Sequence, residues 1–266
     1  MNDLLAWFRF QRFPFDKNIK TGEAFDSASL TECIARLEYM KRRCGIMLLT
    51  GDPGVGKSLA LRRFTDSLNE NLFQAFYTPL STLTRIDMLK HLNRLLGLPL
   101  RNAKSANHTQ IQTYLMESRE QRGKTILFAI DEAQLLNSGT LEELRLLTNF
   151  KMDSFDPFIL ILSGQSEMRR TIHFAVMEPF KQRLAMIYHM PPLSREETAQ
   201  YVQHHLKLAG AREPLLDEPA HRAVYDLSFG IPRRIGTIVT EALTYAMFDQ
   251  KRAVSAEMVL KSNHSA

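Results

Sequence analysis

The segment Thr50–Ser58 constrains the fold of this chain more than any other part of the sequence. Every fixed position of the pattern G-x-x-x-x-G-K-[ST] is filled, by Gly51, Gly56, Lys57 and Ser58. The apolar run Ile46–Leu49 before it predicts a buried strand, and Leu59–Leu68 after it predicts a helix. A glycine-rich turn in this setting directs backbone N–H groups and a helix N-terminus at an anion. We therefore expect a nucleotide-phosphate site.

The residue types in this segment indicate separate roles at that site. Lys57 would reach the β- and γ-phosphates of ATP, and the Ser58 hydroxyl would bind Mg²⁺. The alternative interpretation, a glycine-rich turn with no ligand, leaves the complete pattern between a strand and a helix unexplained. The candidate nucleotide contacts are Gly51, Asp52, Pro53, Gly54, Val55, Gly56, Lys57, Ser58 and Leu59.

A second candidate strand, Ile126–Ile130, ends in two carboxylates. Asp131 would hold Mg²⁺, directly or through water, and Glu132 would orient and deprotonate an attacking water. Transfer of phosphate to a substrate hydroxyl has less need of the second carboxylate. The pair therefore favours hydrolysis of the nucleotide.

The order of predicted elements indicates an α/β protein with a parallel β-sheet between layers of helices. Strands are expected at 46–49, 73–78, 126–130 and 158–162, with helices at 27–41, 59–68, 85–96, 109–122 and 140–150. Beyond Pro191 only helices are expected, at 194–209, 216–227, 231–248 and 255–261. We predict an aromatic-rich segment (1–26) that packs on the core, a nucleotide-binding domain (27–191) and a small all-helical lid domain (192–266).

Charge and cysteine content limit the partners and the cellular compartment that we expect for this chain. With 34 Lys and Arg against 29 Asp and Glu, the net charge of +5 permits a polyanionic partner without requiring one. The two cysteines fit neither a metal site nor a disulfide framework, which is typical of a reducing compartment. No apolar run approaches the length of a membrane span. We expect a cytoplasmic protein with no membrane contact.

Taken together, the motifs give the chain a resemblance to the AAA+ ATPases, P-loop NTPases with a helical lid. Within them it resembles most the ExeA-like group, which includes the TnsC/TniB transposition regulators. The matching segments span almost the whole chain: Phe13–Phe15, Leu49–Lys57, Ile130–Gln134, Leu141–Phe150, Leu162–Gln165, Gln182–Leu184 and Gly230–Arg233.

The resemblance implies further roles. Gln165 resembles sensor 1, with Ser163 as the competing choice, and Arg233 resembles sensor 2. Arg183 resembles an arginine finger that enters the neighbouring subunit's site, and Arg169 or Arg170 could replace it. The plainer alternatives are a salt-bridged surface arginine at 183 and a solvated one at 233. A finger supplied in trans implies a homo-oligomer, either a ring or a helical filament.

The resemblance to TnsC, TniB and MuB implies a regulator of transposition. ATP would drive its assembly on double-stranded DNA and recruit a transposase. Candidate DNA contacts lie in a basic helix end and loop after the second strand, the alternative being a solvated loop: Lys90, Arg94, Arg101 and Lys104. Two other functions stay open, an ExeA-like secretion-assembly ATPase and an ATP-dependent protein scaffold without DNA. The ExeA resemblance implies a membrane span and a cell-wall-binding domain, and their absence up to Ala266 favours the transposition role.

Overall fold

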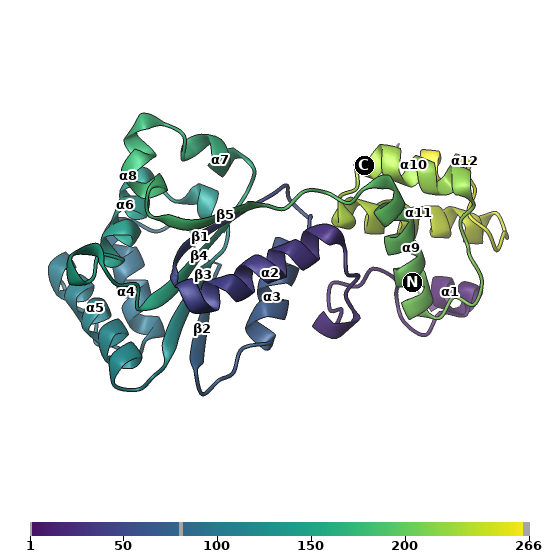
Figure 1. Ribbon diagram of the computed structural model, residues 1–266. Coiled ribbons are helices and arrows are strands. Elements are labelled where there is room, and N and C mark those ends of the chain that lie inside the picture. Colours follow the sequence, from purple (N-terminus) through teal and green to yellow (C-terminus); the bar gives the residue numbers. More distant parts are fainter. Residues whose placement is uncertain (1, 80–81, 263–266) are drawn as a thin grey trace. The chain divides into compact units, whose positions relative to one another are not determined.

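A computed structural model describes residues 2–79 and 82–262 of the chain (Figure 1). The chain divides into two compact units. The sheet unit contains Glu32–Gly51 and Lys57–Met190, and the helical unit contains the residues up to Thr31, Asp52–Gly56 and the residues from Pro191 onward. Residues 1, 80, 81 and 263–266 lie outside the described residues. They include the start of the predicted N-terminal segment and the end of the predicted lid domain.

The sheet unit is built on a five-stranded sheet whose strand order is β2-β3-β4-β1-β5. All neighbouring strands are parallel. The strands are β1 (Gly45–Thr50), β2 (Phe73–Thr78), β3 (Thr125–Ile130), β4 (Phe158–Gly164) and β5 (Leu184–His189). Every residue of β1, β3 and β4 is buried, as expected of parallel strands that helices cover on both faces. The predicted fold class is thus confirmed, and β5 is a strand that the sequence pattern did not predict.

Helices cover both faces of this sheet (Figure 1). The helices α2 (Ala28–Arg43) and α3 (Lys57–Asp66) lie on one face, and α4 (Arg85–Leu95), α5 (Lys104–Glu120) and α6 (Ser138–Leu147) on the other. Phe128 of β3 and Leu160 of β4 belong to one hydrophobic core. Leu92, Ile111 and Leu144 of α4, α5 and α6 belong to the same core. Short helical segments complete the unit: η2 (Ala133–Leu135), η3 (Lys151–Asp153), α7 (Glu167–Thr171), η4 (Ala175–Met177) and α8 (Glu178–Lys181).

The helical unit has its own apolar core. Its helices are α1 (Asn2–Phe8), η1 (Thr21–Glu23), α9 (Arg195–Ala209), α10 (Glu218–Ser228), α11 (Pro232–Phe248) and α12 (Ala256–Ser262). Phe8 and Phe10 of the aromatic-rich N-terminal segment pack in this core with Val202, Val224 and Val239. The predicted start of α9 carries a capping box, in which Ser194 and Glu197 each bond the other's backbone N–H.

Parallel pairing brings the ends of three buried strands to the same edge of the sheet. Thr50 pairs with Gly164, and the N–H of Asp131 donates to the carbonyl of Thr78 at 2.9 Å. The residues that follow β1, β3 and β4 therefore share the carboxyl edge, where open α/β sheets bind ligands. Among residues 2–79 and 82–262, no helix is both long and apolar enough to cross a membrane.

Candidate functional site

The loop between β1 and α3 has a backbone conformation that depends on glycine. Gly54 has φ +90° and Gly56 has φ +112°, a region that residues with a Cβ rarely adopt. The helix α3 begins at Lys57, so Lys57 and Ser58 stand in its first turn, where backbone N–H groups are unpaired within the helix. The Lys57 Nζ donates to the Gly51 carbonyl at 2.7 Å. This geometry suits the binding of phosphate.

Asp131 is the centre of a hydrogen-bond cluster at the carboxyl edge of the sheet. Asp131 is 7% exposed, and within the described residues its carboxylate accepts four hydrogen bonds. Its Oδ1 accepts from the Ser163 hydroxyl at 2.8 Å and from the Glu132 N–H at 3.0 Å. Its Oδ2 accepts from the Ser58 hydroxyl at 3.2 Å and from the Tyr77 hydroxyl at 2.8 Å. The structure thus brings together Ser58 and Asp131, the two predicted metal ligands.

The donor set at this position fits Mg²⁺. Ser58 and Asp131 offer hard oxygen atoms, and Mg²⁺ in nucleotide sites is held by one or two such side chains together with phosphate oxygens. Within the described part of the chain, no cluster of three or more His, Cys, Asp or Glu side chains could hold a metal ion. A protein cage for the ion is therefore absent there, and the fit depends on the phosphates of a bound nucleotide.

Glu132 lies next to this cluster but has different partners. Its backbone is left-handed, with φ 51° and ψ 35°, and its side chain is exposed. Its Oε2 accepts from the Gln134 amide at 2.6 Å and from the Gln165 amide at 3.4 Å. Left-handed backbone at a residue other than glycine costs about 1 kcal/mol or more and concentrates at functional sites. The conformation turns the Glu132 carboxylate toward the two amides.

The two candidates for sensor 1 contact different carboxylates. Ser163, fully buried in β4, bonds Asp131, whereas the Gln165 side chain reaches Glu132. Gln134, which was not among the predicted site residues, holds Gln165 in place because its Oε1 accepts from the Gln165 backbone N–H at 2.9 Å. The structure therefore places Ser163 in the Asp131 cluster and the Gln165 side chain beside Glu132.

Tyr77 is a further residue that sequence analysis missed. It lies in β2 opposite Ala129, and the residue is 52% exposed while its hydroxyl donates to Asp131. Desolvation and the bond to Asp131 raise the pKa of Tyr77 above its usual range, so the hydroxyl stays a donor. Because side chains alternate along β2 and Phe76 stacks on Phe128, Tyr77 faces the other side of the strand, but no sequence pattern indicates its bond to Asp131.

The sequence pattern of the family described as AAA domain matches residues 40–172 of the chain. That span is half of the sequence and contains the loop at Gly51, the Asp131 cluster and Gln165. This chain belongs to the AAA domain family. Membership implies that the chain binds nucleotide and has ATPase activity.

Two relatives resemble this AAA domain chain along most of its length. The general secretion pathway protein A of Aeromonas hydrophila is 32% identical over 218 residues, which are 81% of this chain and 40% of the relative. An uncharacterized HTH-type transcriptional regulator of Methanocaldococcus jannaschii is 23% identical over 221 residues, 77% of this chain and 53% of the relative. The chain therefore spans about half or less of the length of each.

Solved structures share the AAA fold at low sequence identity. Cdc6p of Pyrobaculum aerophilum has a TM-score of 0.63 at 16% identity, and the superposition covers 97% of this chain and 70% of the Cdc6p chain. The RuvB Holliday junction branch migration motor of Thermotoga maritima has a TM-score of 0.57 at 18% identity, with 90% of this chain and 69% of the RuvB chain covered. A Drosophila ORC bound to DNA has a TM-score of 0.64 at 16% identity, covering 98% and 65%. These similarities concern the fold.

The candidate arginine finger of this AAA domain has a partner within its own chain. Arg183 forms an ion pair with Asp153, and only 18% of the Arg183 side chain is exposed. Asp153 belongs to η3, in which Lys151, Met152 and Asp153 all have positive φ. The alternatives Arg169 and Arg170 lie exposed on α7. An action of Arg183 in a neighbouring subunit requires that the pair with Asp153 open.

Arg233 stands in the first turn of α11, after Pro232 at its N-terminus. Within the helical unit its N–H donates to the carbonyl of Gly54 at 3.3 Å. A Cβ on Gly54 would lie 2.6 Å from the Cβ of Arg233, so this approach also requires glycine. The structure thus places the backbone of the sensor 2 candidate against Gly54.

The four candidate DNA contacts do not form a uniform exposed set. Lys90 is half-buried on α4, while Arg94 is exposed in its last turn. Lys104, predicted in a connector, is the first residue of α5 and bonds the buried Glu143 at 2.8 Å. Burial alone would raise the pKa of Glu143, but its bonds with Lys104 and His108 outweigh this and lower it. Lys104 is therefore engaged in an intramolecular pair.

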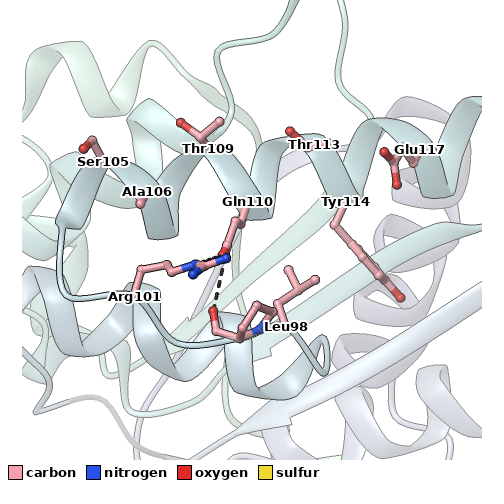
Figure 2. Close-up of a pocket in the computed structure, with 10 residues that line it drawn as sticks. Leu98, Arg101, Ser105, Ala106, Thr109, Gln110, Thr113, Tyr114 and Glu117 are labelled. Carbon is pink, nitrogen blue, oxygen red and sulfur yellow. Dashed lines mark hydrogen bonds between the residues drawn. The ribbon is translucent and has the colours of Figure 1, made fainter.

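Arg101 lies along a groove of about 680 Å³ beside α5 (Figure 2). Its Nε donates to Gln110 at 3.3 Å, and Gln110 in turn donates to the carbonyl of Pro99 at 3.2 Å. Leu98, Ala106 and Tyr114 line the same groove. The residues of the Asp131 cluster do not line it, so the groove is separate from that cluster.

Proposed function

We propose that this chain is an AAA+ ATPase that hydrolyses ATP with Mg²⁺ at the Asp131 cluster. The observation that carries the proposal is the convergence of Ser58, Asp131 and Glu132 on one edge of the sheet. Lys57 and the backbone of residues 51–59 bind the phosphates. Ser58 and Asp131 hold Mg²⁺, which neutralises charge on the β- and γ-phosphates when bound.

Glu132 acts as the general base. Among the described residues, two side-chain amides donate to Oε2 of its exposed carboxylate, which leaves lone pairs for a water molecule. Gln165 bonds the same carboxylate, which supports a sensor role in orienting that water. Ser163 acts on the neighbouring Asp131 and keeps it fixed.

The oligomer follows from the arginines. Arg183 is proposed as the finger that neutralises transition-state charge in a neighbouring subunit, with Arg169 or Arg170 as substitutes. Arg233 is proposed as sensor 2, since its backbone already contacts Gly54. ATP at the boundary then links subunits into a ring or filament. Arg183→Ala is expected to retain ATP binding while hydrolysis and assembly are lost.

A role in assembling a secretion apparatus is the cellular function that the comparisons favour. The general secretion pathway protein A is 32% identical over 81% of this chain, and that name supports the ExeA-like function over the transposition regulator expected from sequence. DNA binding with a transposase partner is the second candidate, supported by the net charge of +5 and by exposed Arg94 and Arg101. An ATP-dependent scaffold without DNA is the third.

One titration separates the DNA-binding function from the two functions that do not involve DNA. The anisotropy of a labelled random-sequence DNA duplex is measured against protein concentration with Mg²⁺ and ATP, a non-hydrolysable analogue or ADP, at two salt concentrations. Light scattering on the same samples reports assembly, and Lys57→Ala serves as the control that cannot bind nucleotide. Assembly with ATP and no DNA binding agrees with the secretion role and with the scaffold, and excludes the DNA-binding role. Cooperative, salt-weakened DNA binding in the ATP state alone would replace it with the transposition role.

A further inference from the structure

The second strand of the sheet supplies a side chain to the metal carboxylate. Tyr77 is the next-to-last residue of β2 and pairs with Ala129 of β3, two residues before Asp131. Because the two strands are parallel and in register, the ends of both reach the same edge. The Tyr77 hydroxyl donates to the Asp131 Oδ2 at 2.8 Å, a shorter distance than the 3.2 Å bond from Ser58 to the same atom.

Burial does not explain a tyrosine at this position. Tyr77 is 52% exposed, so it contributes little to the core, against which Phe76 of the same strand packs. A surface tyrosine normally bonds water. This one donates to a carboxylate that is itself only 7% exposed. The Tyr77 hydroxyl, rather than its ring, therefore makes the contact that distinguishes this residue.

The four hydrogen bonds on Asp131 fix the orientation of its carboxylate. A carboxylate has about four lone-pair positions, and each oxygen of Asp131 accepts two donors. Ser163 and the Glu132 N–H fix Oδ1, while Ser58 and Tyr77 fix Oδ2. Ser58 is also the proposed metal ligand, and when its hydroxyl turns to Mg²⁺ it frees a lone pair of Oδ2 for the ion while the bond from Tyr77 remains. Without Tyr77, the described residues leave Oδ2 a single, longer hydrogen bond.

We propose that Tyr77 is a positioning residue that orients Asp131 toward Mg²⁺. This inference rests on the proposed function, because it assigns Ser58 and Asp131 to the metal. Hydrogen bonds from an outer shell to a ligating carboxylate set its direction, and their loss lowers metal affinity or activity by roughly 10- to 100-fold. Tyr77 acts through Asp131 and does not itself contact ATP.

The test measures nucleotide binding without turnover. The affinity of the full chain for a fluorescent ATP analogue is titrated against Mg²⁺ concentration, and separately in EDTA. Tyr77→Phe removes only the hydroxyl oxygen. We expect the Mg²⁺ concentration for half-maximal binding to rise about 10-fold, while the affinity in EDTA stays at the wild-type value. Tyr39→Phe is the matched control, since Tyr39 is a 51% exposed tyrosine on α2.

Tyr77→Leu and urea unfolding separate the hydroxyl from the ring. If the hydroxyl is responsible, Tyr77→Leu shows the same Mg²⁺ shift as Tyr77→Phe, with unfolding midpoints close to wild type. An unchanged Mg²⁺ requirement in Tyr77→Phe, or a shift confined to Tyr77→Leu, overturns the proposal. A wild-type chain that binds the analogue no better with Mg²⁺ than in EDTA contradicts the proposed metal site instead, and the inference with it.

Discussion

At the scale of single residues, Asp131 and Glu132 are adjacent in sequence but have separate sets of partners. Asp131 is buried and accepts hydrogen bonds from hydroxyls and a backbone N–H, as suits a carboxylate that must stay in place. Glu132 is exposed and accepts from two amides. One left-handed residue produces this difference, because it directs the second side chain away from the first.

Single substitutions at the two sensor candidates are predicted to have different signatures. Ser163→Ala removes a donor from Asp131, so the Mg²⁺ requirement should rise about 10-fold. Gln165→Ala removes a donor from Glu132, so the turnover number should fall about 10-fold or more while nucleotide binding is unchanged. Steady-state phosphate release against Mg²⁺ and ATP concentration distinguishes them. Identical profiles for the two variants would contradict the assignment.

His205 is predicted to make the stability of the helical unit depend on pH. Burial, with a smaller effect of His204 and Arg12, lowers the pKa of His205 from 6.5 to about 4. The unfolded chain then binds the proton first, so stability present above pH 6.5 is lost as the pH falls toward 4. The loss is at most about 3 kcal/mol. Urea unfolding across this range should show a weaker pH dependence in His205→Phe than in wild type or in the surface control His173→Gln.

At the scale of elements, the glycine between α10 and α11 controls the geometry of the helical unit. Gly230 has φ +70°, and its carbonyl accepts the N–H of Leu193 at 2.9 Å. A Cβ on Gly230 would collide with the Leu193 backbone. The position therefore needs both the left-handed conformation and the absence of a side chain.

Gly230→Ala is predicted to destabilise the helical unit strongly. The left-handed conformation alone costs roughly 1–2 kcal/mol, and the collision with backbone adds to it. Gly210→Ala is the matched control in the same unit, because it has φ +110° and meets only ordinary contacts, the nearest at 3.4 Å. Urea unfolding should show a larger loss for Gly230→Ala. Equal losses would mean that the contact with Leu193 relaxes.

The elements that sequence analysis predicted are those with one dominant physical signal. The strands β1, β3 and β4 are continuous apolar runs because both faces are covered. The edge strand β5 was missed because it is not a continuous apolar run: most of its residues are partly buried, Ile187 is exposed, and only Tyr188 is buried. The start of α5 was missed because its first turn is small and polar. There, buried Asn107 bonds Asn93, a contact between helices that no local pattern carries.

The same division holds in the site. The residues at the ends of buried strands could be predicted, because chain order and strand ends determine their place. Tyr77 could not be predicted as a site residue, because tyrosine is common in edge strands for its β-propensity, with or without a functional role. The pair of Arg183 and Asp153 joins positions that only tertiary folding brings together.

At the scale of the whole molecule, the chain combines the proposed phosphate site with an arginine that forms an ion pair within its own chain. Arg183 is mostly buried against Asp153, so its proposed action on a neighbouring subunit competes with a bond inside the subunit. In ATP-dependent assembly, contacts repeated at each boundary between subunits would supply the free energy needed to open the pair of Arg183 with Asp153. Hydrolysis would then reverse it.

The central claim, hydrolysis of ATP with Glu132 as base, is tested most directly by Glu132→Gln. The change keeps the shape and removes the charge, so the variant should bind ATP and Mg²⁺ like wild type but hydrolyse ATP about 100-fold more slowly. Glu167→Gln on α7 is the control and should keep the wild-type rate. The measurement is phosphate release at saturating ATP, with nucleotide binding measured in parallel. Turnover at the wild-type rate in Glu132→Gln would contradict the account.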